Sequence, residues 1–239
     1  MTVAVPVEAD AGLPDDLADD LAGASLVLAR RLHAGGTLWC ASPAWPHHAQ
    51  HLAVEFVHPV VVGKPAVPAV ALATHELVAA ARANVRSGDA LVVIGGSADE
   101  LVRQLLRRAP AWGVTTLWFG TGPLPEPGSA DHVLWSEDEV AAHDGRFILL
   151  YHLLWELTHV CLEHRGLLDP PPEVEGPVCT TCSDERRIAE VVTVAGTTAR
   201  VRTAAGPEDV DLSLVGDARP DDLLVVHAGM AITLLASSS

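Results

Sequence analysis

The pattern of apolar and polar positions changes once along the chain. Up to about residue 168, two kinds of segment alternate. One kind has apolar residues at helical spacing, as in Leu17, Leu21, Leu28 and Leu32, and the other is a short, nearly continuous apolar run, as in Asp89–Ile94. Strands that alternate with helices are typical of parallel β-α-β units, so we predict an α/β sheet covered on both faces.

The individual elements follow from where each pattern begins and stops. The predicted helices are Asp15–His33, His47–Phe56, His75–Val85, Ala98–Arg108 and Arg146–His164. The predicted strands are Thr37–Cys40, Val67–Ala73, Asp89–Ile94, Val114–Phe119 and Asp131–Trp135. Together they predict a three-layer α/β domain that occupies residues 1–168.

A second, all-β domain is predicted after a linker. Residues 169–177 are rich in proline and acidic residues, which favours an extended, semi-rigid connection. From residue 178 to residue 239, short apolar runs are separated by turn residues, with almost no helical pattern. The runs are Ile188–Val194, Ala199–Thr203, Val210–Leu214 and the closing stretch Leu223–Ile232. Such closely spaced short strands are typical of a small OB-like β-barrel.

Charge and cysteine content narrow the class of protein. Lys and Arg number 15 against 31 Asp and Glu, a formal charge of −16, which disfavours binding to nucleic acid or to an anionic membrane. Four cysteines, of which only Cys179 and Cys182 are close in sequence, do not form a disulfide framework. The N-terminus lacks a basic region before its apolar residues, and no apolar run reaches membrane-spanning length, so we expect a cytoplasmic protein.

Candidate metal ligands stand in the second domain. Cys179 and Cys182 form a C-x-x-C pair that is suited to a shared metal or to redox chemistry, and His227 closes an apolar strand. A structural zinc site and a histidine satisfied within the core are the alternatives, although a structural zinc site usually has four ligands.

The opening cysteine, the sequence D-L-S-L-V-G from Asp211 and the sequence V-H-A-G-M-A-I around His227 resemble the HypC/HupF family of hydrogenase assembly chaperones. This resemblance implies that a cysteine and His227 hold the iron fragment, an Fe-cyanide-carbonyl unit, of the [NiFe] site. It also implies a HypD-type scaffold and the hydrogenase large-subunit precursor as partners. Cys179 fits the family's opening position, and Cys182 is the alternative; the two cysteines acting together is a third arrangement.

The first domain carries a second resemblance. The stretch from Cys40 to Glu55, with A-Q-H-L-A-V-E at its end, is similar to the SIS domain, and within it to phosphoheptose isomerases. That family binds sugar phosphate through glycine-rich loops, but here the corresponding loop carries Pro43 and Trp45, and the second loop carries Ser97 and Asp99. We therefore expect a remodelled pocket, containing Trp45 and Ser97, that does not hold a sugar phosphate in the family's way.

The same resemblance implies a second metal site. His51 and Glu55 are spaced i, i+4 on one helix face, where their side chains converge. In the isomerases the matching pair binds a catalytic metal together with a glutamine and a histidine from the last helix, positions held here by Tyr151 and His159. Zinc or iron suits this donor set, and a buried polar cluster is the alternative. His152, His47 and His48 are nearby in sequence, and we expect the last two at the surface.

Three functions remain open from the sequence. The first is a [NiFe]-hydrogenase maturation factor, with a scaffold role favoured over an enzymatic one. The second is a metal-dependent sugar-phosphate isomerase-like enzyme whose proton-transfer pair is Glu55 and His159, a pair of suitable chemistry for moving a proton next to a carbonyl. The third is a pure interaction module. Since SIS-like domains commonly associate through their helices, we also expect a homo-oligomer.

Overall fold

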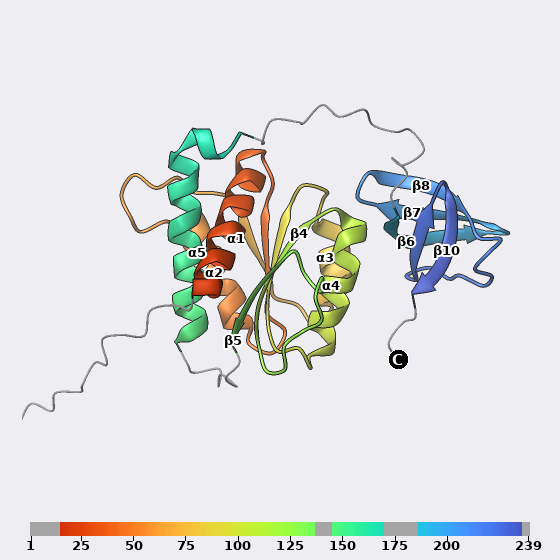
Figure 1. Cartoon of the computed structure of the whole chain (residues 1–239), viewed down its shortest axis with the longest axis horizontal. Helices are drawn as coiled ribbons and strands as arrows, with labels where there is room; N and C mark the ends of the chain where they lie inside the picture. Colours follow the sequence, from red (N-terminus) through yellow and green to blue (C-terminus); the bar gives the residue numbers. More distant parts are fainter. Residues whose placement is uncertain (1–14, 137–144, 170–185, 236–239) are drawn as a thin grey trace, which may run out of the picture.

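The chain forms two bodies of different architecture. The computed structural model describes residues 15–136, 145–169 and 186–235. Helices and parallel strands alternate in the first range, and the second range adds helices to the same body. The regular elements of the third range are all strands. Figure 1 shows the first body as a sheet between helices, with the smaller barrel lying beyond helices α3 and α4.

The sheet of the first body is entirely parallel, as the alternation of strands and helices predicted. Its strands lie in the order β2-β1-β3-β4-β5, and every neighbouring pair is parallel. The strands are β1 (Leu38–Ala41), β2 (Ala69–Leu72), β3 (Ala90–Ile94), β4 (Thr115–Thr121) and β5 (His132–Ser136). The strand order reverses between β1 and β3, and the carboxyl ends of strands at such a reversal are where open α/β sheets bind ligands.

Helices cover both faces of this sheet, which confirms the predicted three-layer arrangement. The helices are α1 (Asp15–His33), α2 (Pro46–Val57), α3 (Leu77–Asn84), α4 (Glu100–Trp112) and α5 (Arg146–Glu163), followed by the short 3₁₀ helix η1 (Arg165–Leu167). One apolar core lies between the sheet and α1, α2 and α5, and includes Leu28, Phe56 and Tyr151. A second lies on the opposite face under α3 and α4, and includes Val93 and Trp112.

Helix α4 runs further than its sequence pattern predicted. It begins at Glu100 because the Asp99 carboxylate accepts hydrogen bonds from the backbone amides of Leu101 and Val102. It continues through Pro110 and ends at Gly113, whose φ of 71° is the left-handed conformation that glycine adopts without steric cost. The extra turn carries Trp112, which contacts the barrel.

The second body is the predicted β-barrel. Its five strands close in the order β10-β8-β7-β6-β9. They are β6 (Arg187–Ala195), β7 (Thr198–Thr203), β8 (Gly206–Asp211), β9 (Leu223–His227) and β10 (Met230–Leu235). Strand β8 starts four residues earlier than predicted, because Gly206 pairs directly with Thr203 in a tight hairpin. It ends at Asp211, whose carboxylate accepts hydrogen bonds from the amide and hydroxyl of Ser213.

The predicted linker falls in the gap between the described parts. Only Asp169 of the segment 169–177 is described, so the domain limits stay a prediction. Within the described ranges, the longest helices are too short or too polar to cross a lipid bilayer.

Candidate functional sites

His227 stands at the start of a tight turn that closes the barrel. It pairs with Met230 across a two-residue hairpin loop, whose central residues Ala228 and Gly229 have φ values of 50° and 74°. Positive φ at both positions defines a type I′ turn, which matches the twist of the flanking strands. The Asp211 amide then donates a hydrogen bond to the Gly229 carbonyl, so the turn is held against β8.

One ring nitrogen of His227 is buried and has no hydrogen-bond partner among the described residues. Its Nδ1 is shielded from solvent and forms no hydrogen bond with any described residue, although the side chain as a whole is half-buried. Buried polar atoms are nearly always hydrogen-bonded, and an exception calls for an explanation. In the tautomer that carries its proton on Nε2, Nδ1 has the electron pair that a metal ion requires.

The described chain enters the first strand of the barrel beside this histidine. Strand β6 pairs antiparallel with β9, and Arg187 lies opposite Val226, so the continued register puts Arg186 opposite His227. Cys179 and Cys182 themselves lie outside the described residues.

A second cluster of donor atoms lies between α2 and α5. Glu55 Oε1 is 3.1 Å from His51 Nε2 and 3.5 Å from His152 Nε2. The ligand atoms of the three residues all lie within 4.8 Å of one another, and this is the one such group found among the described residues. The side chains are between 18% and 40% exposed, so solvent reaches the cluster. Two imidazoles and a carboxylate with an open side form the donor set of a catalytic zinc site.

Tyr151 supports this cluster from the protein side. Its hydroxyl lies 2.8 Å from His51 Nδ1, and burial, with a contribution from the Glu55 carboxylate, raises the pKa of Tyr151 to about 12. The phenol therefore stays protonated at neutral pH. It donates to Nδ1 while Nε2–H donates to Glu55, or it accepts from Nδ1–H and leaves the Nε2 lone pair free for a metal.

His159 does not join His51 and Glu55 in this cluster, contrary to the expected ligand set. It is buried two helical turns along α5, where Nδ1 lies 2.9 Å from the Trp155 carbonyl and Nε2 lies 3.0 Å from the Pro65 carbonyl. Carbonyl oxygens only accept hydrogen bonds, so each ring nitrogen of His159 faces an acceptor and not a donor. His152 takes the place that the sequence analysis gave to His159, because the turn of α5 that carries His152, and not the turn two further along, lies against Glu55 of α2.

His48 is buried rather than exposed, so the expectation of a surface position was wrong for this residue. It is 1% exposed and packs edge-on against Phe147 and Tyr151, whereas His47 is exposed. Neither ring nitrogen of His48 has a hydrogen-bond partner among the described residues. Burial, followed by the neighbouring His47 and His51, lowers the pKa of His48 to about 4.

Trp45 and Ser97, which we expected to share a remodelled pocket, line different surfaces. Trp45 packs against Phe147, with ring centroids 5.7 Å apart, at the core under α1, α2 and α5. Ser97 lines a cavity of about 430 Å³ beside Arg103 and Trp118. A separate groove of about 380 Å³ lies at the carboxyl ends of β1 and β2 and is lined by Ser42, Pro43, Pro46, Gln50, Leu72, Ala73, Thr74, His75, Leu77 and Leu101.

Asp99 accounts for the absence of a phosphate-binding helix terminus at the second loop. The first free amides of a helix form a natural anion site, but the Asp99 carboxylate already accepts those of Leu101 and Val102 in α4. A phosphate at this end of α4 would have to displace that carboxylate.

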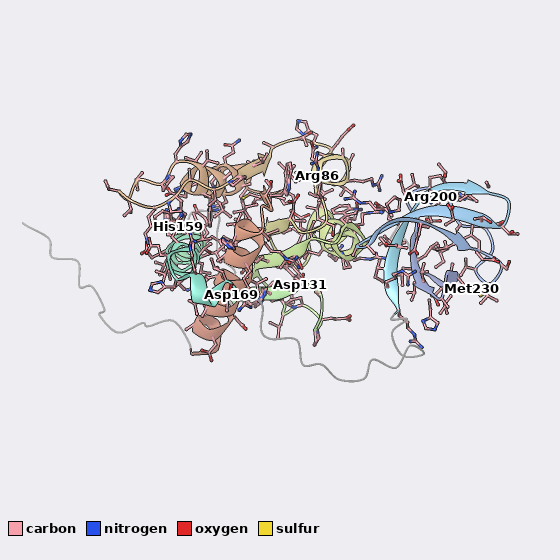
Figure 2. All side chains as sticks on the ribbon, turned by 90° about the horizontal axis from the view of Figure 1, so that it is seen from above. Arg86, Asp131, His159, Asp169, Arg200 and Met230 are labelled. Atoms are coloured by element: carbon pink, nitrogen blue, oxygen red, sulfur yellow. The ribbon has the colours of Figure 1, made fainter. Side chains whose placement is uncertain are left out.

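The two metal-ligand candidates lie at opposite ends of the molecule. Figure 2 places His159 of α5 at one end and Met230, the residue after the His227 turn, at the other, with α4 between them. The α2–α5 cluster and the barrel turn are therefore separate sites within one chain.

Comparisons with known proteins match the two bodies to two different groups. Residues 188–239 match the HupF/HypC family, which confirms the resemblance of the barrel. Among curated proteins, none matches the chain. The matched segment is less than half of the chain, so it describes the barrel and not the first domain.

Solved structures resemble the first body. A phosphoheptose isomerase from Francisella tularensis superposes with a TM-score of 0.54 at 18% identity, covering 61% of this chain and 88% of that one. The sugar isomerase domain of an RpiR transcription factor from Sphaerobacter thermophilus gives 0.46 at 18% identity, covering 62% and 82%. HobA from Helicobacter pylori gives 0.44 at 12% identity, covering 62% and 81%. At this identity, the isomerase match establishes a SIS-like fold and no shared activity. The chain is thus a SIS-like domain followed by a HupF/HypC-type barrel.

Proposed function

We propose that this protein is a [NiFe]-hydrogenase maturation factor whose barrel carries the iron fragment of the active site through Cys179 or Cys182 together with His227. The match of residues 188–239 to the HupF/HypC family supports a role in hydrogenase maturation. The observation that carries the site is the buried, unpartnered Nδ1 of His227.

Chain geometry allows either thiol to reach this imidazole. Cys182 is four positions before Arg186, the position opposite His227, and four residues of chain span at most about 14 Å. Cys179 is seven residues away and reaches at most about 25 Å. Both distances exceed the few ångströms needed for a thiolate and an imidazole to bind one ion.

The chemistry suits the cargo. Thiolate is a soft donor that favours iron in a low oxidation state, and imidazole is a common partner ligand. The type I′ turn fixes the backbone next to His227, so one ligand is preorganised while the cysteine arrives from the neighbouring segment. In this scheme the iron fragment is cargo, received from a HypD-type scaffold and passed to the hydrogenase large-subunit precursor in the cytoplasm.

Infrared spectroscopy of protein co-expressed with its maturation partners tests this proposal. We expect cyanide and carbonyl stretching bands in the purified chain, lost in His227→Ala and in Cys179→Ala or Cys182→Ala. His33→Ala, which alters an exposed histidine of α1, and Cys161→Ala, which alters a half-buried cysteine of α5, are the matched controls and should keep the bands. Bands that survive in His227→Ala and in the double cysteine variant would refute the proposal.

The α2–α5 cluster supports a second candidate function, binding of zinc or iron by His51, Glu55 and His152. The donor atoms already lie within bonding reach of a common ion, and the bound metal would supply a Lewis acid at a solvent-facing position. Glu55 holds both histidines, while Tyr151 fixes the His51 ring. Zinc titration by calorimetry should give one site that is lost in His152→Ala and kept in His159→Ala. The reverse result would restore the ligand set expected from the isomerases.

An isomerase reaction is the less favoured use of this cluster. Both nitrogens of His159 face backbone carbonyls, and Asp99 occupies the helix terminus that a sugar phosphate would need. Turnover of a heptose phosphate that is abolished by Glu55→Ala would nevertheless establish it, and tight binding of that sugar phosphate in the groove would overturn our expectation.

A further inference from the structure

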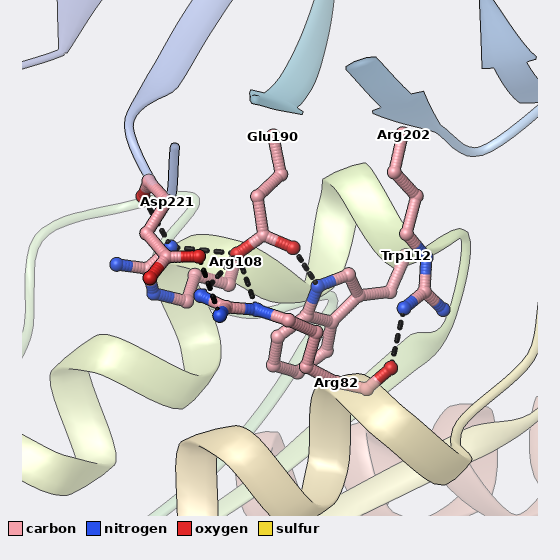
Figure 3. A network of polar contacts seen from close by, with 6 residues as sticks. All are labelled: Arg82, Arg108, Trp112, Glu190, Arg202 and Asp221. Atoms are coloured by element: carbon pink, nitrogen blue, oxygen red, sulfur yellow. Dashed lines mark hydrogen bonds and ion pairs between the residues drawn. The ribbon is translucent and has the colours of Figure 1, made fainter. Parts of the chain in front are cut away.

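The barrel is attached to the first domain by a buried carboxylate. Glu190 of β6 is 2% exposed, yet its side chain points away from the barrel core, because the neighbouring Ala189 and Val191 fill that core. Figure 3 shows where it goes: into a pocket formed by side chains of α3 and α4.

Every hydrogen bond that Glu190 accepts there comes from the first domain. Arg82 donates through Nε and Nη2, at 3.1 and 2.9 Å, and Arg108 donates through Nη1 at 2.7 Å. Trp112 donates its indole N–H to the other carboxylate oxygen at 2.9 Å. A buried carboxylate is tolerated only with such complete pairing, since an unpaired one costs several kcal/mol.

A second set of hydrogen bonds is donated by the barrel to the first domain. Arg202 of β7 donates to the carbonyls of Arg82 and Val85, both at 2.7 Å, which are free acceptors at the end of α3. Its guanidinium lies 5.8 Å from the centroid of the Trp112 ring. Asp221 pairs with Arg82 at 2.6 Å, and Leu223 belongs to the apolar core under α3 and α4.

We propose that the function of the α3–α4 face of the SIS-like domain is to hold the barrel in one orientation, as a docking platform fitted to Glu190 and Arg202. The platform binds the barrel independently of the linker, and it contacts the barrel through β6 and β7, the strands of Glu190 and Arg202. A partner of the barrel therefore has to bind a surface other than the faces of β6 and β7 that already contact α4. This holding role does not depend on what the barrel carries, so it stands or falls separately from iron binding.

Cleavage of the linker in the folded full-length chain tests the platform. A protease recognition sequence is inserted between Pro172 and Glu173, the purified protein is cut, and the two fragments are passed over a size-exclusion column at about 10 μM. We expect the fragments to co-elute. In Glu190→Ala we expect association to weaken by about 100-fold or more, so that they separate, because Arg82 and Arg108 lose their common partner.

Two further variants keep the test decisive. Glu208→Ala removes a carboxylate of similar type that pairs with Arg187 within the barrel, and its fragments should still co-elute. Arg82→Gln changes a half-exposed donor and serves if Glu190→Ala fails to fold; we expect its fragments to separate or to elute broadly. Separation of the wild-type fragments, or co-elution of both the Glu190 and Arg82 variants, would refute the proposal.

Discussion

Two polar clusters on opposite faces of the first domain differ in how completely their members are satisfied. Around Glu190, four donor contacts converge on one buried carboxylate. Around Glu55, two imidazoles face one carboxylate in contact with solvent, and each ring nitrogen that faces it has a lone pair to offer in one tautomer. A saturated cluster fixes structure, whereas an unsaturated one is available for a ligand. The following predictions test that distinction, beginning with the largest expected effect.

Replacing Glu190 by Ala should lower the free energy of unfolding by about 3 kcal/mol, because the part-buried Arg82 and Arg108 lose their shared carboxylate and the buried Trp112 indole N–H loses its acceptor. Denaturant unfolding, followed by tryptophan fluorescence, measures this change. Glu208→Ala, in a half-exposed pair, should cost no more than about 1 kcal/mol. Equal losses in the two variants would mean that the Glu190 cluster is no more structural than an ordinary surface pair.

Replacing His48 by Leu should remove an acid sensitivity of about 2 kcal/mol. The pKa of His48 is about 4 in the folded chain and about 6.5 when unfolded, so the unfolded state binds the proton first. Stability from this residue is complete above pH 6.5 and falls as the pH drops towards 4. Comparing unfolding free energies of the variant and wild type at pH 7.5 and pH 5 measures the difference. An unchanged pH dependence would show that His48 titrates normally.

Replacing Tyr151 by Phe should weaken zinc binding at the α2–α5 cluster by about tenfold, or about 1.4 kcal/mol, since His51 loses the hydroxyl that orients it. Competition with a chelating dye measures the affinity. His47→Ala, on the exposed side of α2, is the control and should bind as wild type does. Affinity that is unaffected by the loss of the hydroxyl would place the metal away from His51.

Replacing Asp99 by Ala should cost about 1 kcal/mol, because α4 loses its N-terminal cap. Asp99→Ser retains a capping oxygen and should cost less than half as much. Thermal unfolding of the two variants compares them directly. Equal losses in the two variants would indicate that the Asp99 charge, and not its hydrogen bonds, matters at this position.

Sequence patterns were sufficient for the elements but not for their arrangement. Apolar patterns located the five long helices and most strands of the described residues to within a few positions, but the closing stretch Leu223–Ile232 was predicted as one run and forms two strands, β9 and β10. The order β2-β1-β3-β4-β5 depends on pairings between distant segments, and no local pattern encodes it. The early end predicted for α4 shows the same limit, since Trp112 lies in the helix only with the cap at Gly113.

The site residues also divide into those that a local pattern predicts and those that depend on long-range packing. His51 and Glu55 could be found because they are four residues apart on one helix. His152 could not be ranked above His159, because the two lie on nearly the same face of α5 and the choice depends on which turn of α5 lies against the α2 pair, a hundred residues away. Glu190 stands on the outward side of β6, where a charged residue is normally solvated. Only the contact with α4 shows that it is buried.

The bonds from Arg202 to the end of α3 have a consequence for biosynthesis. A ribosome completes α3 more than a hundred residues before it reaches β7, so the Arg82 and Val85 carbonyls must first be hydrated. They exchange water for a guanidinium only when the barrel emerges and settles on them. Nascent chains stalled before residue 202 should therefore show faster amide exchange around residues 82–88 than released protein, and the last-made part of this polypeptide finishes a helix made long before it.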